Sequence, residues 1–283
     1  MTTVETVRTL QDLKRRVAAW RTAGESVGLI PTMGALHEGH MQLVRLAHRR
    51  AKRCVVSIFV NPTQFAPHED FDRYPRDEAG DLGKLGLVGC DLVWAPDKNV
   101  MYPEGFATRI VPAGAAEGLE SDFRPGFFGG VATVCCKLFT QVAPDIAVFG
   151  EKDYQQLRVV RQMVSDLNLP LEIVAAPTVR ESDGLAMSSR NRYLSAEDRA
   201  TAPTIHRVIV SVAKAAAEGK EAAAAVEGKQ ALEAAGFKVE YLDVRDAETL
   251  KALEPGASRL KRVLAAAWLG KTRLIDNVAV PAA

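Results

Sequence analysis

The sequence lacks several features that would place it in other classes of protein. No apolar run approaches the roughly 20 residues that a membrane-spanning helix needs. The first eight residues carry neither the basic cluster nor the apolar run of a secretion signal. The 36 basic and 35 acidic residues nearly cancel, and aromatic residues make up only 6% of the chain. Neither charge nor a basic, aromatic-rich module therefore predicts a nucleic-acid partner, and no membrane partner is expected.

Cysteine is also scarce, and its placement excludes two further classes. The four cysteines are Cys54, Cys90, Cys135 and Cys136, which lie in apolar runs and form no Cys-x-x-Cys pattern. This placement is typical of small buried side chains in a reducing compartment, and it favours neither a disulfide framework nor a metal site. We therefore expect a cytoplasmic protein with no metal held by a dedicated set of side chains.

The first 175 residues alternate between apolar runs of strand length and helical patterns. Strands are expected at 27–31, 54–60, 91–94, 146–149 and 171–175, and helices at 40–53, 77–87, 131–142 and 154–167. The strands are continuously apolar, which is typical of a parallel sheet that is covered on both faces. The pattern predicts an α/β fold with a Rossmann-like doubly wound sheet, whose ligands bind beyond the carboxyl ends of the strands.

The pattern of expected helices and strands changes after Arg192. A capped helix start at 195–198 leads into an alanine-rich helical stretch that runs towards residue 235, and three strand-like runs follow at 238–244, 262–268 and 273–280. We therefore predict a large domain over 1–178 and a smaller α+β domain over 179–283. Gly270-Lys271-Thr272 resembles the end of a phosphate-binding loop, but Ala265 occupies the position of the required glycine, so a hairpin turn is expected.

The most informative segment runs from residue 28 to residue 40. An apolar run ends at Pro31, a turn with Gly34 follows, and His37 and His40 stand where a helical pattern begins. The first N–H groups of a helix are unpaired and its dipole favours anions, so this arrangement predicts a phosphate site. A zinc-protease helix needs its histidines four residues apart, and here they are three apart. A pair of solvated histidines near a cap is the remaining alternative.

Three other segments are rich in polar side chains and follow predicted strands or the domain boundary. Asn61 and Gln64 could read the hydroxyl and carboxylate groups of a small ligand, although Asn-Pro-Thr is also ordinary turn chemistry. Lys152 and Gln156 stand at a helix start, where a solvated cap is the alternative. The hydroxyls and guanidinium of 188–190 could clamp a polyphosphate, although the segment could instead be a flexible linker.

The motif Pro-Thr-Met-Gly-Ala-Leu-His-Glu-Gly-His at 31–40 resembles the nucleotide-binding signature of the pantoate–β-alanine ligase family. The resemblance continues in order through 59–65, 74–76, 124–126, 130–134, 137–139, 149–157 and 187–194, so it covers essentially the whole chain. The family belongs to the wider superfamily of His-x-Gly-His nucleotidyltransferases and class I aminoacyl-tRNA synthetases. Arg190 stands where that superfamily often has lysine, and Phe127 stands where many family members have histidine, so we assign Phe127 no role.

The resemblance implies an ATP-dependent condensation of (R)-pantoate with β-alanine through a pantoyl adenylate, with Mg²⁺ on the phosphates and a homodimeric assembly. It assigns catalysis to His37, His40, Lys152, Ser188, Ser189 and Arg190. The implied ATP contacts are Met33, Gly34, Ala35, Leu36, His37, Glu38, Gly39, His40, Gly150, Glu151, Lys152, Asp153, Val179, Met187, Ser188, Ser189 and Arg190. The implied contacts to pantoate or β-alanine are Asn61, Gln64, Arg124 and Gln156. The loop at 67–74 and the small domain would cover the site.

Three other functions share parts of this pattern. A nucleotidyltransferase would stop at an adenylated or cytidylylated product, but it gives no reason for the amides of Asn61, Gln64 and Gln156. A non-catalytic RNA-binding relative of the synthetases is disfavoured by the balanced charge. A protein that only senses nucleotide is disfavoured by the intact histidines, lysine and Ser-Ser-Arg segment.

Overall fold

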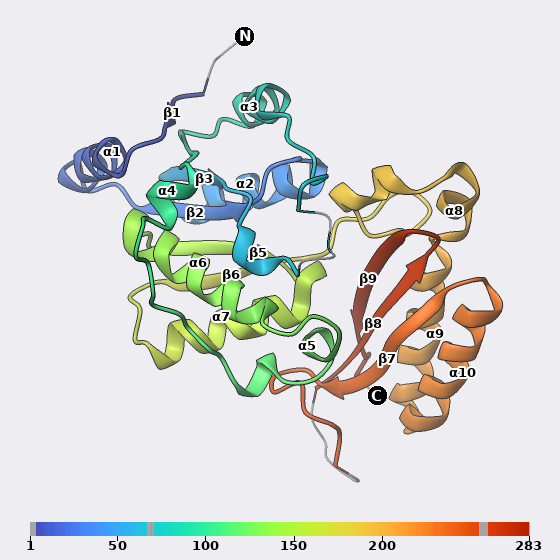
Figure 1. Cartoon of the computed structure of the whole chain (residues 1–283). Helices are drawn as coiled ribbons and strands as arrows, with labels where there is room; N and C mark the ends of the chain where they lie inside the picture. Colours follow the sequence, from blue (N-terminus) through green and yellow to red (C-terminus); the bar gives the residue numbers. More distant parts are fainter. Residues whose placement is uncertain (1–3, 67–68, 70, 255–259, 283) are drawn as a thin grey trace.

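The computed structural model describes residues 4–66, 69, 71–254 and 260–282, which form two sheets with their helices (Figure 1). The larger sheet contains β1 (Thr6–Val7), β2 (Val27–Thr32), β3 (Arg53–Ile58), β4 (Leu92–Trp94), β5 (Ile146–Gly150) and β6 (Glu172–Ala176). Its spatial order is β1-β4-β3-β2-β5-β6, and every neighbouring pair is parallel. The chain moves outward from β2 in one direction and from β5 in the other. The crevice between β2 and β5 is therefore the switch point at which such sheets bind ligands.

Helices cover both faces of this sheet because its strands are apolar on both sides. On one face, α2 (Glu38–Arg50) and α3 (Glu78–Leu87) pack against a cluster that includes Ile30 and Val148. On the other face, α1 (Leu10–Thr22), α6 (Phe127–Val142) and α7 (Tyr154–Asp166) pack against a cluster that includes Leu29 and Phe149. Adjacent residues such as Leu29 and Ile30 thus pack into the cores on opposite faces of the sheet, because successive side chains of a strand point to opposite faces. The predicted doubly wound α/β fold is confirmed.

Short elements connect these layers. They are α4 (Lys98–Met101), α5 (Glu120–Phe123) and the 3₁₀ turns η1 (Pro62–Gln64), η2 (Gly114–Ala116), η3 (Glu151–Asp153) and η4 (Ser189–Tyr193). Sequence reasoning missed β1 and α1. The start of α1 is capped by Thr9, whose Oγ1 accepts from the Asp12 N–H, and its buried face repeats at Leu13, Val17 and Trp20.

The smaller domain contains α8 (Ala196–Thr201), α9 (Thr204–Ala217), α10 (Glu221–Ala234), β7 (Lys238–Asp246), β8 (Lys261–Leu269) and β9 (Thr272–Ala279). Its three strands are antiparallel in the order β7-β8-β9, and Gly270 and Lys271 make the predicted hairpin turn. Helices α9 and α10 cover the face of this sheet that is turned away from the large domain (Figure 1). The predicted smaller α+β domain is confirmed, while the boundary at 178/179 stays a prediction.

The uncovered face of the small sheet meets the large domain through polar contacts and through apolar side chains such as Leu264. Arg273 of β9 pairs with Glu120 of α5 at 2.8 Å and with Glu240 of β7 at 2.7 Å. Tyr241 donates its hydroxyl to Glu120 at 2.7 Å. Burial alone would raise the pKa of Glu120, but Arg273 and these hydrogen bonds hold it below its ordinary value. The two domains are therefore joined by charged groups that have partners on both sides.

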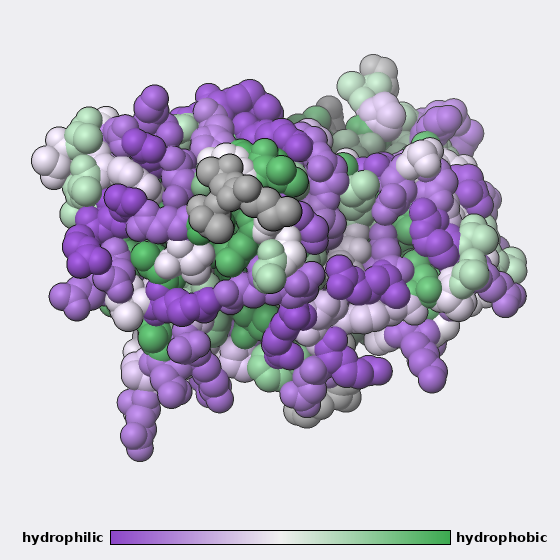
Figure 2. Space-filling view, turned by 90° about the horizontal axis from the view of Figure 1, so that it is seen from above, coloured by the Kyte–Doolittle hydropathy of each residue, from purple (hydrophilic) through white to green (hydrophobic). Residues whose placement is uncertain are grey.

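The face of the molecule that is seen from above is mainly hydrophilic (Figure 2). Figure 2, seen from above, shows hydrophilic side chains over most of that face, with apolar side chains gathered in a few small areas. Among the described residues, no helix combines the length and the apolar character needed to cross a membrane. The four cysteines are all free, and three of them are buried.

Candidate active site

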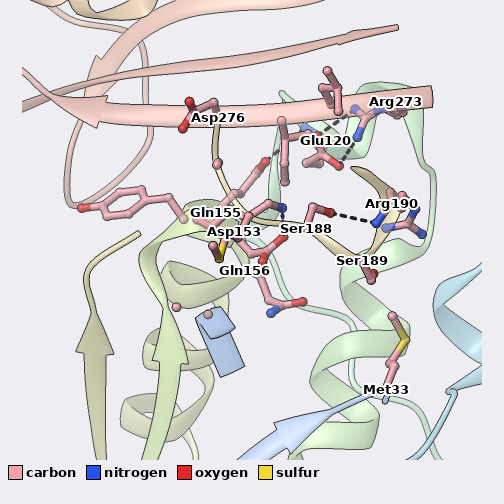
Figure 3. A pocket seen from close by; sticks show the side chains of 18 of the residues that line it. Met33, Glu120, Asp153, Gln155, Gln156, Ser188, Ser189, Arg190, Arg273 and Asp276 are labelled. Atoms are coloured by element: carbon pink, nitrogen blue, oxygen red, sulfur yellow. Dashed lines mark hydrogen bonds and ion pairs between the residues drawn. The ribbon is translucent and has the colours of Figure 1, made fainter. Parts of the chain in front are cut away.

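A cavity of about 690 Å³ opens at the carboxyl ends of β2 and β5 and extends to the small domain. Most of the predicted site residues line it: Met33, His37, Gly39, His40, Asn61, Gln64, Arg124, Gly150, Lys152, Asp153, Gln156, Val179, Met187, Ser188, Ser189 and Arg190. In Figure 3, Asp153 and Gln156 lie on one side of Ser188, and Ser189, Arg190 and Met33 lie on the other. The fold thus brings together segments that are up to about 150 residues apart.

His37 and His40 form the start of α2 and share its first hydrogen bonds. His37 is the N-cap, and its Nδ1 accepts from the Gly39 N–H at 3.2 Å. His40 closes a reciprocal capping box, because its Nδ1 accepts from the His37 N–H at 3.3 Å. The predicted helix began at residue 40, whereas α2 begins at Glu38, because the histidine rings themselves cap it. The N–H groups of His37 and Gly39 are therefore occupied by imidazoles.

Both rings are neutral at physiological pH. Burial, together with the nearby charge of Lys152, lowers the pKa of His37 to about 4. Burial also lowers the pKa of His40 to about 3, with contributions from His37 and Lys152. Because each Nδ1 accepts a hydrogen bond, each neutral ring carries its proton on Nε2. Two imidazoles can therefore donate to the same anion without carrying a positive charge.

The turn between β2 and α2 is held by a residue that sequence reasoning missed. The carboxylate of Asp81, from α3, accepts from the N–H groups of Ala35 and Leu36, both at 2.8 Å. The Gly34 N–H donates to Thr32 Oγ1 at 3.2 Å. Ala35 lies in the left-handed region with φ +52°, and Asp81 is 1% exposed. Only the contact across the fold marks Asp81 as important, since its neighbours in the sequence give no signal.

Five residues of the predicted ATP set fall outside the cavity lining. The amides of Gly34, Ala35 and Leu36 are engaged as described, and Leu36 is buried in the core under α2. Glu38 turns outwards to Arg45, and Glu151 pairs with Arg262 at 3.1 Å. At these five positions the structure shows contacts within the protein, and their contact with ATP stays a prediction.

Lys152 approaches the histidines from the other side of the switch point. It lies in η3, between β5 and α7, and its side chain is 20% exposed. Its Nζ is 3.7 Å from Asp153 Oδ1, and its charge contributes to the lowered pKa values of His37 and His40. Two neutral N–H donors and one ammonium therefore converge where β2 and β5 end, as a phosphate site requires.

Asn61 lines the cavity, but its side chain is committed to the protein. Its Nδ2 donates to Gln64 Oε1 at 3.0 Å and to the Gly130 carbonyl at 3.1 Å. Its Oδ1 accepts from Tyr102 Oη at 2.8 Å and from Thr63. Asn61 is 1% exposed and orients Gln64 through its hydrogen bond, while its contact with a substrate stays a prediction. In the sequence the amides of Asn61 and Gln64 are equally suited to bind a ligand, and only their contacts in the structure distinguish them.

A glycine of α6 makes this arrangement possible. A Cβ placed on Gly130 would lie 2.2 Å from the Thr63 carbonyl oxygen, so η1 can pack on α6 only where the helix has no side chain. The Gly130 carbonyl is also the one that receives the Asn61 hydrogen bond. Gln64 is consequently fixed from two sides, and its Nε2 lies 3.2 Å from Met33 Sδ across the cavity.

Arg124 is held between carboxylates and an aromatic ring. Its guanidinium pairs with Glu69 at 2.6 Å and lies 3.5 Å from Glu120. It also stacks on the Phe127 ring at 3.7 Å from the ring centre. Phe127, to which the sequence assigned no role, thus supports the Arg124 side chain. Contact of Arg124 with a substrate stays a prediction.

The Ser188–Arg190 segment lies against the segment 71–74. Ser188 caps η4 by accepting from the Arg190 N–H at 3.3 Å, and Ser189 Oγ lies 3.3 Å from Tyr74 Oη. The Arg190 guanidinium faces the Tyr74 ring at 5.8 Å. The predicted covering loop at 67–74 is thus described at 69 and 71–74, whereas residues 67, 68 and 70 lie outside the described residues. These contacts bring the start of the small domain over the cavity.

Two neutral imidazole donors and a lysine at the switch point of a doubly wound sheet suit the phosphates of a nucleotide. Fold and site together define a nucleotide-dependent enzyme of the nucleotidyl-transfer class. The family model described as pantoate-beta-alanine ligase matches residues 5–279. The chain therefore belongs to the pantoate–β-alanine ligase family, as the motifs predicted.

Individual relatives agree over the full length. The chain is 55% identical over 284 residues to the pantothenate synthetase of Caulobacter vibrioides, with 99% of this chain and 100% of the relative covered. It is 57% identical over 275 residues to that of Rhodopseudomonas palustris, with 96% and 97% covered.

Solved structures support the same assignment. The crystal structure of pantothenate synthetase from Thermus thermophilus matches with a TM-score of 0.92 at 46% identity, covering 98% of this chain and 99% of that chain. A pantoate-beta-alanine ligase from Francisella tularensis, crystallised with Beta-gamma ATP and β-alanine, matches with a TM-score of 0.82 at 31% identity. The match covers 98% of this chain and 97% of the Francisella chain.

Proposed function

We propose that this chain condenses (R)-pantoate with β-alanine at the expense of ATP, through a pantoyl adenylate, and releases AMP and pyrophosphate. The observation that carries the proposal is the convergence of His37, His40 and Lys152 at the switch point, beside the amides of Gln64 and Gln156. A phosphate site and a small-acid site thus share one cavity. Family membership supplies the identity of the two acids.

In the first step a pantoate carboxylate oxygen attacks the α-phosphorus of ATP, and the bond from that phosphorus to the pyrophosphate oxygen breaks. The carboxylate is already a nucleophile, so positioning and charge stabilisation carry the catalysis. His37 and His40 donate hydrogen bonds from Nε2–H to phosphate oxygens as negative charge develops. Lys152 supplies a positive charge, and Ser188 to Arg190 hold the departing pyrophosphate.

Mg²⁺ fits this site as a companion of ATP. Among the described residues no cluster of three or more His, Cys, Asp or Glu side chains could hold a metal ion, so Mg²⁺ would enter with ATP and be held mainly by the phosphates and water. When bound, the ion neutralises phosphate charge.

In the second step the β-alanine amine attacks the acyl carbon, a carbon–nitrogen bond forms, and AMP leaves as the carbon–oxygen bond breaks. The acyl adenylate must be kept from water until then. Tyr74 and the Ser188–Arg190 segment contact each other above the cavity and supply that cover. Gln64 and Gln156 hold pantoate, whereas Gly150, Asp153 and Val179 contact the adenosine.

We place the working protein in the cytoplasm as a homodimer with a domain boundary near 178. The free cysteines support a reducing compartment, and family resemblance supports the dimer. β6 ends at Ala176 and α8 begins at Ala196, which brackets the proposed boundary.

The test measures pyrophosphate and AMP from ATP, Mg²⁺ and D-pantoate, with β-alanine present or withheld. Pyrophosphate forms without β-alanine, and AMP and pantothenate appear when it is added. His40→Ala should slow pyrophosphate formation by about 10²-fold, because it removes one preorganised donor to the developing charge. His48→Ala is the matched control, since His48 lies in the last turn of the same helix, where it contacts the Gly89 carbonyl.

Three results would contradict the proposal. Pyrophosphate formation without AMP release in the presence of β-alanine would favour a nucleotidyltransferase. The absence of any stimulation by pantoate in folded, ATP-binding protein would exclude the ligase. A His40→Ala variant that retains its rate would remove that histidine from the mechanism.

A further inference from the structure

Asn277 of the small domain contacts the backbone of η3, the turn that carries Lys152. Asn277, in β9, donates from Nδ2 to the Glu151 carbonyl at 2.9 Å and to the Lys152 carbonyl at 2.8 Å. Asn277 is 4% exposed, and more than 120 residues separate it from η3 in the sequence. Both hydrogens of its amide are therefore used on two consecutive carbonyls of the other domain.

The two carbonyls belong to the peptide groups on either side of the Lys152 Cα. The direction of a Cα–Cβ bond is fixed by the planes of the two peptides that flank it. Anchoring both planes therefore fixes where the Lys152 side chain leaves the backbone. A four-carbon flexible side chain gains most from such an anchor, because its own rotamers give little preorganisation.

Asn277 is itself held in one orientation. Its Oδ1 accepts from Arg262 Nε at 2.7 Å, so the amide cannot turn over without losing this bond. Arg262 is 8% exposed, stacks on the Tyr154 ring at 3.7 Å, and pairs with the Glu151 carboxylate at 3.1 Å. The amide nitrogen therefore faces the turn, and each polar atom of the Asn277 side chain has a defined partner.

We propose that Asn277 is a positioning residue that aims Lys152 at the phosphates of ATP, with Arg262 fixing its orientation. This inference rests on the proposed phosphate-binding role of Lys152. Asn277 does not touch substrate in this scheme; it acts only through the backbone of η3. The small domain then contributes to ATP affinity as well as covering the cavity.

Asn277→Asp is the sharpest variant. It preserves size and the contact with Arg262, but it replaces the donor by an oxygen that faces two carbonyl oxygens. We expect ATP affinity, measured by calorimetry with Mg²⁺ and no pantoate, to fall by about tenfold to a hundredfold, the penalty typical of a misplaced binding group. Adenosine affinity should stay within about twofold, because adenosine has no phosphate for Lys152 to meet.

The matched control is Tyr154→Phe. The Tyr154 hydroxyl donates to the Ala247 carbonyl at 2.8 Å, so this variant also removes one buried bond between the domains, while the ring under Arg262 remains. Its ATP affinity should match that of the unmodified protein. If Asn277→Asp fails to fold, Asn277→Ala removes both bonds without adding charge, and the same pattern is expected.

A double-mutant cycle with Lys152→Ala separates the inference from the proposed function. If Asn277 acts through Lys152, Asn277→Asp costs no further ATP affinity once the lysine is gone. Additive losses, an equal loss of adenosine affinity, or unchanged ATP affinity in Asn277→Asp would overturn the inference while leaving the role of Lys152 intact. A Lys152→Ala variant with normal ATP affinity would instead refute the proposed role of Lys152, and the inference with it.

Discussion

Acidification from pH 8 to pH 5 should destabilise the free protein through His37 and His40. In the folded protein burial lowers their pKa values to about 4 and about 3, whereas a histidine in an unfolded chain has a pKa near 6.5. Between these pKa values the two histidines are protonated in the unfolded chain but neutral in the folded protein. The stabilisation is therefore fully present above pH 6.5 and is lost as the pH falls below it.

The size of the effect follows from the same values. At pH 5 an unfolded histidine is mostly protonated and each folded ring is still neutral. pH 5 lies about 1.5 units below the unfolded pKa, and each unit is worth about 1.4 kcal/mol. Each ring therefore lowers the unfolding free energy by about 2 kcal/mol. The pair together should remove about 4 kcal/mol of unfolding free energy between pH 8 and pH 5.

Urea unfolding at both pH values measures this loss. A double variant, His37→Gln with His40→Gln, has no titrating ring at either position, so its stability should fall by about 4 kcal/mol less than that of the unmodified protein. Carboxylates titrate in both proteins and cancel in the difference. Ring-nitrogen NMR on the ligand-free protein provides the second readout, with both rings neutral and protonated at Nε2 at pH 5.5.

The reasoning would be refuted by either measurement. A ring that titrates with a pKa above 6 would mean that burial and the backbone hydrogen bonds do not exclude the proton. Equal losses of stability in the double variant and the unmodified protein would mean that other groups cause the acid sensitivity.

Two further substitutions test the framework around the site. Gly130→Ala should lower the unfolding free energy by about 1–3 kcal/mol and raise the KM for pantoate, because its Cβ would lie 2.2 Å from the Thr63 carbonyl oxygen and displace Gln64; urea unfolding and initial rates measure both. Asp81→Asn should cost about 1.5–3 kcal/mol in urea unfolding, because a single amide oxygen replaces a carboxylate that accepts from the Ala35 and Leu36 N–H groups.

Each of these has a control in α3. A Cβ on Gly83 meets nothing within 4 Å, so Gly83→Ala should be neutral or slightly stabilising. Asp77 is the exposed N-cap of the helix, where asparagine serves equally well, so Asp77→Asn should be nearly neutral. A Gly130→Ala protein with normal stability and pantoate KM, or an Asp81→Asn protein as stable as Asp77→Asn, would contradict the packing described.

Local patterns predicted the sheet because its strands are buried on both faces and so remain continuously apolar. They also predicted that His37 and Lys152 would meet, since both follow strands that end at one edge of a parallel sheet. They placed the start of α2 at residue 40, two residues late. The reason is that His37 and His40, which are interpreted as ligand groups, also form the cap of the helix. Periodicity reports which side chains are buried, but it does not report how a turn directs its amides.

The residues that could not be predicted act at long range. Asp81 lies 45 residues from Leu36, and Asn277 lies 125 residues from Lys152, so neither has a nearby signal in the sequence. Asn61 and Gln64 have the same chemistry three residues apart, and only the Gly130 and Tyr102 contacts give one a structural role. Such assignments depend on which partner the tertiary fold supplies.

The smaller domain is part of the framework of the phosphate site as well as its cover. Asp276 and Asn277 are consecutive in β9, so their side chains point to opposite faces of the strand. Asp276 makes a bidentate pair with Arg180 at 2.7 and 2.9 Å. Arg180 also donates to the carbonyl of Gly184, in the segment that leads to Ser188. Asn277 holds the carbonyls around Lys152. One short piece of strand therefore fixes the backbone of both segments that are proposed to contact the phosphates, and displacing β9 would disturb them together.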